Sequence, residues 1–137
     1  PDFTFNNYFI GLALQGKNIT VYGEGEQLRN VMYVDDAVQA LIISAVSDKT
    51  NGETLFAVSD NHLSVAEIAK ATVEYIGSGR VKHIPWPDER KAIDIGDAVI
   101  SNHKIKTLLN WTPKCDLKSG LIKTGGYYKE HLKYYLR

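Results

Sequence analysis

The side chain best suited to bind a ligand is that of Arg29, which follows a glycine turn and precedes a short apolar run. A β-branched segment, Ile19–Tyr22, leads into that turn, whose glycines are Gly23 and Gly25. Because the turn separates two extended segments, we expect the arginine to emerge at the edge of a cleft. A guanidinium holds phosphate oxygens in a planar, bidentate fork. The spacing therefore favours a phosphate ligand, and it leaves open a surface arginine paired with a glutamate of the turn.

A pair of carboxylates, Asp35 and Asp36, is the second group with possible chemistry. Paired carboxylates serve acid–base catalysis and metal binding in many proteins. Here they stand directly before an apolar helical run, where negative charge at the first turn is favoured by the helix dipole. We therefore expect the pair to be structural.

The elements that must position these residues alternate without a regular strand–helix rhythm. Hydrophobic spacing predicts helices over 3–14, 35–46, 64–75, 102–109 and Leu117–Tyr135, and strands over Ile19–Tyr22, 31–34, 54–58 and Val81–Ile84. The second helix is apolar on most faces, so it should be well buried. Ser64 and Glu67 fit a capping box for the third helix. The mixture predicts an α+β protein, or a piece of a larger α/β protein.

Composition indicates an ordinary globular chain of about one domain. The 137 residues are 44% hydrophobic and 23% charged, with no net charge. Without a basic surplus, nothing favours nucleic-acid binding, and no apolar run approaches the roughly 18 residues of a membrane span. The single cysteine, Cys115, allows no internal disulfide, which suits a cytoplasmic protein. The histidines are scattered, so a zinc site is not expected.

Five motifs, taken in order, resemble those of the NAD-dependent epimerase/dehydratase family, the extended short-chain dehydrogenases/reductases that include UDP-glucose 4-epimerase. The family typically reads Y-G-D-G-x-Q-x-R-D, followed by Y-V-D-D, where this chain has VYGEGEQLRNVMYVDD. Downstream, the family's R-x-G-D, L-G-W-x-P and G-L-x-x-T patterns correspond to segments around Gly96, Trp111 and Gly120. The resemblance extends over nearly the whole chain.

The resemblance implies an α/β fold of which residues 1–137 form the C-terminal, sugar-nucleotide-binding part. The N-terminal Rossmann domain, which holds NAD in the family, would be absent, and the start without methionine agrees with that expectation. NAD would therefore be bound outside this chain. The resemblance also implies a nucleotide-sugar substrate and a homodimer formed through helices of the absent domain.

The resemblance also implies the roles of individual residues. In the family, the arginine after the glycine turn contacts the diphosphate of the nucleotide sugar, and Arg29 matches that position. The end of the preceding strand holds the nucleotide base, which implies a base contact for Tyr22 with Thr20 and Val21 alongside. A strand tyrosine that fills the core remains the alternative for Tyr22.

Two positions depart from the family's pattern. Asp94 stands where R-x-G-D has its arginine, and we expect Arg90 or Lys91, one helical turn away, to replace that arginine. The alternative is a solvated charged loop without a ligand. Asn30 follows Arg29 where the family usually has aspartate, which removes a carboxylate that could orient the arginine.

We expect the chain to be catalytically inert by itself. The family oxidises its sugar with a Ser/Thr and a Tyr-x-x-x-Lys pair as acid and base, and no such pair is found here in a credible context. The nearest string to a dinucleotide fingerprint, GEGEQL, has two glycines and leads into a polar turn instead of a helix. The chain's share of catalysis would be binding energy that orients the hexose.

Two other interpretations remain open at this stage. The chain could be a non-catalytic module that binds a nucleotide sugar or a protein, which the departures at Asn30 and Asp94 favour. It could also be a scaffold without a ligand. Under the enzyme interpretation, the helix after Asp36 packs on the Rossmann domain, so this chain alone should expose apolar surface there and associate with itself.

Overall fold

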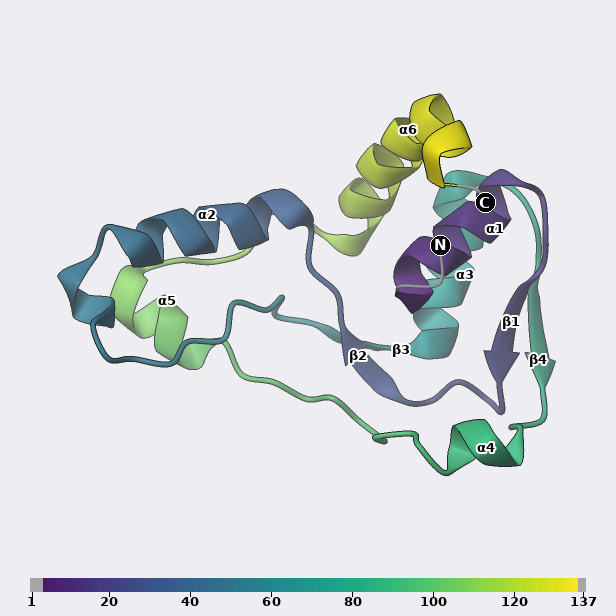
Figure 1. Ribbon diagram of the computed structural model, residues 1–137, viewed down its shortest axis with the longest axis horizontal. Helices are drawn as coiled ribbons and strands as arrows, with labels where there is room; N and C mark the ends of the chain where they lie inside the picture. Colours follow the sequence, from purple (N-terminus) through teal and green to yellow (C-terminus); the bar gives the residue numbers. More distant parts are fainter. Residues whose placement is uncertain (1–3, 136–137) are drawn as a thin grey trace.

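Two groups of elements lie at opposite ends of an elongated molecule (Figure 1). The computed structural model describes residues 4–135. One end, here called the body, contains α1 (Phe5–Leu14), β1 (Ile19–Tyr22), α3 (Val65–Ile76), β4 (Val81–Ile84) and α6 (Leu117–Tyr135). The other end, here called the arm, contains α2 (Val34–Ala45), the 3-10 helix η1 (Asp48–Thr50) and α5 (His103–Leu109). Between them lie β2 (Leu28–Asn30) and β3 (His62–Ser64), and α4 (Asp88–Lys91) follows β4.

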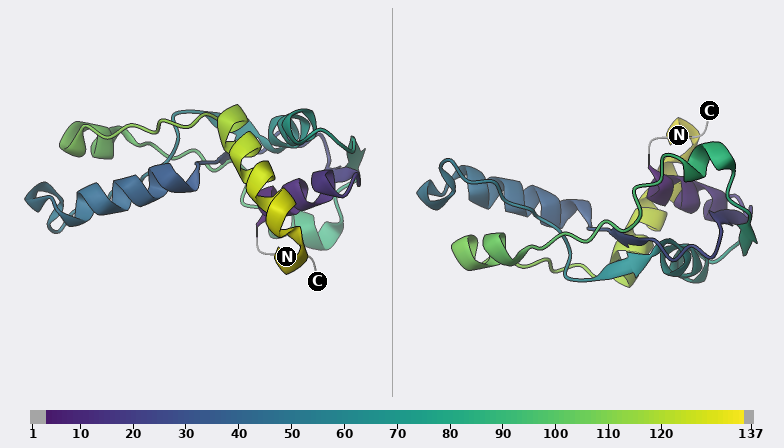
Figure 2. Two further views of the ribbon diagram at one scale, coloured as in Figure 1. Left: turned by 90° about the horizontal axis from the view of Figure 1, so that it is seen from above. Right: turned by 90° about the horizontal axis from the view of Figure 1, so that it is seen from below.

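The body contains a small α/β core. Its strands β1 and β4 pair in parallel, from Ile19 opposite Val81 to Tyr22 opposite Ile84. Helices α1, α3 and α6 contact one another beside these strands (Figure 2). Side chains of α1, α3 and β1 form one buried cluster, made of Phe9, Ala13, Ile19, Val21, Ile68 and Ala69. The mixed α/β character expected from the sequence is confirmed.

Helix α3 starts where its own sequence specifies. The Ser64 side chain accepts a hydrogen bond from the Glu67 N–H at 3.1 Å, and the Glu67 carboxylate accepts one from the Ser64 N–H at 2.7 Å. These bonds to Ser64 hold the pKa of Glu67 below its usual value. The capping box is therefore confirmed. The first helix begins at Phe5 behind Thr4, so the predicted start at Phe3 lies outside the described residues.

The arm buries much less than its composition predicts. Ala40, Ile105 and Trp111 form its core, and Asn110 ends α5 in the left-handed conformation (φ 51°), which asparagine tolerates better than most residues. The opposite face of α2 is exposed and apolar, and it is made of Val34, Val38, Leu41 and Ile42. The prediction of a well-buried second helix is therefore wrong for this chain. The exposed face agrees with the apolar surface expected of a chain that lacks a neighbouring domain.

Two predicted strands are wrong. Residues 31–33 join β2 to α2 without pairing, and Val34 already opens the helix. Residues 54–58 form no strand, because Leu55 and Ala57 pack against the arm core with no neighbouring strand to bond. The observed ribbon instead pairs β2 with β3, from Leu28 opposite Ser64 to Asn30 opposite His62. Short apolar runs do not reveal their partners, which explains both errors.

Asp36 ties the arm to the segment that leads into α6. Its carboxylate is buried and accepts hydrogen bonds from the backbone N–H groups of Lys114 (3.1 Å) and Cys115 (2.9 Å). Its neighbour Asp35 is exposed at the first turn of α2. Both positions fit the structural role expected of the pair. Along residues 4–135, no helix is both long and apolar enough to cross a membrane.

Candidate functional site

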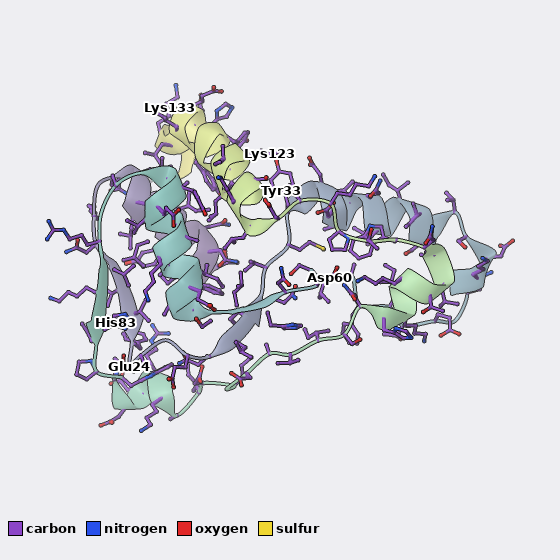
Figure 3. All side chains as sticks on the ribbon, turned by 180° about the vertical axis from the view of Figure 1, so that it is seen from behind. Glu24, Tyr33, Asp60, His83, Lys123 and Lys133 are labelled. Carbon is purple, nitrogen blue, oxygen red and sulfur yellow. The ribbon has the colours of Figure 1, made fainter. Side chains whose placement is uncertain are left out.

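All five residues that the sequence assigns to a ligand line one open cleft of about 640 Å³: Thr20, Val21, Tyr22, Arg29 and Arg90. The strands supply one part of the cleft, the start of α1 another, and the segment after β4 the rest. Figure 3 shows this end of the molecule from behind, with Glu24 and His83 labelled close to α4. The structure therefore brings together residues that are up to 70 positions apart in the sequence.

An aromatic pair forms one side of the cleft. Because β1 and β4 run in parallel, the residues that come after them lie close together, and the rings of Tyr22 and Trp86 are 5.4 Å apart at 41°. Gly23 has φ 58°, and a Cβ atom there would lie 2.7 Å from the indole nitrogen of Trp86. A glycine is therefore required where the indole packs over the turn. Tyr22 is half-buried and lines the cleft, so it is not a core residue.

Trp86 is a site residue that the sequence analysis missed. It lies between two prolines, two positions after β4. The sequence feature that could have revealed it is the pair of β-branched segments. Two parallel strands place the residues that follow them at the same edge of a sheet. Reading 19–22 and 81–84 as parallel partners would have placed this tryptophan beside Tyr22.

The guanidinium of Arg29 is held by three groups of the protein. Its Nη1 donates to the carbonyl oxygens of Leu28 (2.8 Å) and Gly96, and its Nη2 donates to Asp94 Oδ1 at 3.2 Å. The Arg29 and Asp94 side chains are only 18% and 22% exposed. A guanidinium has five N–H donors, so these bonds leave two without a partner among residues 4–135. Those two donors can bind one further oxyanion at the cleft.

The alternative interpretation of Arg29 is thus correct about pairing and wrong about the partner. The carboxylate is Asp94, 65 positions away, and not a glutamate of the glycine turn. Asp94 is itself fixed, because its Oδ2 accepts a hydrogen bond from the Gly96 N–H at 3.1 Å. The same loop is bound to β2 a second time, where Asp97 Oδ1 accepts from the Leu28 N–H at 2.8 Å.

Of the two cations proposed to replace the family's second arginine, Arg90 lines the cleft and Lys91 does not. Arg90 lies on α4 and is exposed. The segment expected to be a charged loop therefore contains a short helix that places this arginine. With Arg29, Arg90 and Asp94 ionised, these three side chains give the cleft one net positive charge.

The hydrogen bonds of the Asn30 side chain explain why an asparagine stands at this position. Its side-chain amide donates to the carbonyl oxygens of Ser59 (2.9 Å) and Asn61 (3.2 Å), and its oxygen accepts from the Ser59 N–H (2.9 Å). An ionised aspartate could not donate to those carbonyls. The departure from the family's aspartate therefore fixes the 59–61 loop and does not touch Arg29.

A metal site and a dinucleotide-binding turn can be checked directly among the described residues. No group of three or more His, Cys, Asp or Glu residues that could hold a metal ion occurs within 4–135. The glycine turn leads into β2 and not into a helix, so the dinucleotide-binding unit is not formed here and the residues do not fit NAD. A smaller cavity of about 140 Å³ borders Cys115, whose thiol pKa is raised by burial, which disfavours the nucleophilic thiolate.

Comparison with known proteins identifies the family. Residues 4–57 match the family model described as "NAD dependent epimerase/dehydratase family". The UDP-N-acetyl-alpha-D-glucosaminuronate decarboxylase of Bacillus cytotoxicus is 33% identical over 89% of this chain and 39% of its own length. The dTDP-glucose 4,6-dehydratase of Salmonella typhimurium is 32% identical over 85% of this chain and 33% of its own. The resemblance to the NAD-dependent epimerase/dehydratase family that the motifs predicted is therefore confirmed.

A solved structure extends the likeness to the fold. The UDP-glucose 4-epimerase of Thermotoga maritima, determined with UDP-glucose, matches with a TM-score of 0.78 and 26% identity. The match covers 94% of this chain and 40% of that protein. The chain thus spans about two fifths or less of the length of these relatives.

Proposed function

We propose that the chain is the substrate-binding, C-terminal part of an NAD-dependent enzyme that acts on a nucleotide sugar. The observation that carries the proposal is the guanidinium of Arg29, held in a cleft with two N–H donors left for a ligand. The Tyr22–Trp86 pair supplies an aromatic surface for a base in the same cleft. Phosphate and a planar base are the two parts that every nucleotide sugar contains.

Each part of the cleft then has a role. Arg29 binds the diphosphate, Tyr22 and Trp86 contact the base, and Thr20 and Val21 lie beside it. Arg90 provides a second positive charge from α4. Binding of this kind lowers the barrier by holding the sugar in a fixed orientation, which is worth several kcal/mol in favourable cases.

The chemical step belongs to the part of the enzyme that this chain lacks. We propose that a Rossmann domain binds NAD, supplies the acid–base residues and covers the apolar face of α2, so that the chain alone binds substrate without turning it over. The relatives' names share nucleotide sugars and differ in reaction, with decarboxylation, dehydration and epimerisation all represented. Among these we propose a UDP-glucose 4-epimerase-like reaction, and the Thermotoga maritima epimerase structure, which covers 94% of this chain, supports it.

Calorimetric titration of UDP-glucose and dTDP-glucose into the chain tests the proposal. We expect one of them to bind, and Arg29→Ala to weaken that binding at least tenfold, because charge-assisted hydrogen bonds are lost. Arg80→Ala is the matched control, since Arg80 is exposed and lies outside the cleft lining. Unchanged binding in Arg29→Ala, with wild-type circular dichroism, would refute the assignment of the diphosphate to Arg29.

A second candidate is a non-catalytic module that binds the same ligand. The pairing of Arg29 with Asp94 favours it, since a carboxylate stands where the family carries a second arginine. The two candidates predict the same titration and differ in the gene. A glycine fingerprint and a Y-x-x-x-K motif encoded upstream of this chain would favour the enzyme, and a start codon directly before Pro1 would favour the module.

A further inference from the structure

We propose that Asp94 makes the cleft select nucleotide sugars, whose diphosphate is esterified at both ends, over free nucleoside diphosphates. The inference rests on the proposed function and assigns a specificity-determining role to a residue that does not itself bind the ligand. It starts from the position of the carboxylate, which accepts a hydrogen bond from the same guanidinium that would hold the phosphate.

Asp94 is not the sole anchor of Arg29. The Nη1 atom of Arg29 is also bound by the backbone carbonyls of Leu28 and Gly96, and the Leu28 carbonyl makes no bond to the carboxylate. Loop 94–97 is also attached to β2 through Asp97 and the Leu28 N–H at 2.8 Å. The two bonds that Asp94 accepts, from Arg29 and from the Gly96 N–H, account for its place in the loop, and its negative charge acts in addition on whatever else Arg29 binds.

The charge of Asp94 acts directly on a bound phosphate. Two oxygens hydrogen-bonded to one guanidinium lie roughly 4–6 Å apart, well inside the Debye length of about 8 Å at physiological ionic strength. A phosphate on the two remaining donors of Arg29 is therefore repelled by the carboxylate. Arg90 is the one other cation of the cleft lining among the described residues, and it is exposed, so it compensates only in part.

Repulsion of this kind depends on the charge of the ligand. A diphosphate esterified at both ends carries one negative charge on each phosphate. A free terminal phosphate carries up to one more, because its second ionisation has a pKa near 6. By Coulomb's law in a partly solvated cleft, one extra charge at this separation changes affinity by about five- to tenfold. Asp94 thus penalises the free nucleotide more than the nucleotide sugar.

The test is a titration of UDP-glucose and UDP, in buffer free of divalent cations at pH 8, into the chain and its Asp94→Asn and Asp94→Glu variants. The measured quantity is the ratio of the two Kd values, UDP over UDP-glucose. We expect Asp94→Asn to lower that ratio about five- to tenfold and Asp94→Glu to keep it. Asp88→Asn is the matched control, since it removes an equal charge from α4 outside the cleft lining.

An unchanged ratio in Asp94→Asn, with both ligands still bound, would overturn the inference and leave the proposed function standing. If neither ligand binds the wild type or any variant, the proposed function fails and the inference fails with it. Salt provides a second measurement. The difference in the Kd ratio between the wild type and Asp94→Asn should shrink as salt rises, because the repulsion is screened, and a difference that is indifferent to salt would contradict the role of charge.

Discussion

The body and the arm use helices of similar length in opposite ways. In the body, α3 has 12 residues, and it buries Ala66, Ile68, Ala69 and Thr72. In the arm, α2 also has 12 residues, and it buries only Asp36 and Ala40. Its apolar residues Leu41 and Ile42 are 71% and 58% exposed. Two helices with the same length and abundant apolar residues therefore differ in whether a neighbour covers them.

The difference shows which part of the molecule covers its own apolar faces. The body closes its core with its own helices and strands, so its elements can be explained from this chain alone. The arm covers one face of α2 with Ile105 and Trp111 and leaves the other without a neighbour among the described residues. Exposed apolar faces of this kind mark interaction surfaces. The cleft, whose residues come from β1, β2, α1, the start of α3 and the segment around α4, lies beside the body core.

The largest expected effect comes from a pair of side-chain truncations, one in each region. Ile68→Ala in α3 should lower the free energy of unfolding by about 3–4 kcal/mol, because it leaves a cavity in the body core. Leu41→Ala in α2 should change it by less than about 0.5 kcal/mol, because that side chain is already in solvent. Urea unfolding at low protein concentration measures both. Equal losses would mean that the arm is packed as tightly as the body.

The sequence predicted the body better than the arm for a physical reason. The capping box at Ser64 depends on a few neighbouring residues, so local rules suffice. The pairing of β2 with β3 joins segments more than 30 positions apart, and neither has a strong strand pattern. The exposure of α2 depends on whether a neighbour is present, which no periodicity reveals.

The residues of the candidate site also fall into those that local sequence predicts and those that depend on distant contacts. Arg29 and Tyr22 could be predicted because a glycine turn and a strand end mark them in the sequence. Trp86 and the ion pair of Arg29 with Asp94 could not, because both arise when the segment after β4 folds back onto β2. Residue types near a site were thus predictable, and the partners that set its charge were not.

A second test concerns the hydrogen bonds of Asp36 that link α2 to the segment before α6. Asp36→Asn should cost about 2 kcal/mol, because the new amide turns a donor toward the N–H of Lys114 or Cys115, where the carboxylate now accepts from both. Asp35→Asn is the control at the same helix turn. It is exposed and should cost only about 0.5 kcal/mol through the helix dipole. Thermal unfolding gives the losses, and a cost for Asp36→Asn no greater than the control would exclude the carboxylate as that link.

Association of the chain with itself tests the arm most directly. The face of α2 formed by Val34, Val38, Leu41 and Ile42 recurs at the spacing of one helical stripe, so two copies can cover it in one contact. Leu41→Glu should weaken that association about tenfold, because burying a leucine contributes about 1.5 kcal/mol or more. Ile93→Glu, at a residue that is equally exposed and lies outside the arm, should leave it unchanged. Light scattering over a range of concentrations measures both. A wild-type chain that stays monomeric and binds no apolar dye would show that α2 does not need a neighbour. The arm and the body would then differ in shape and not in their need for a neighbour.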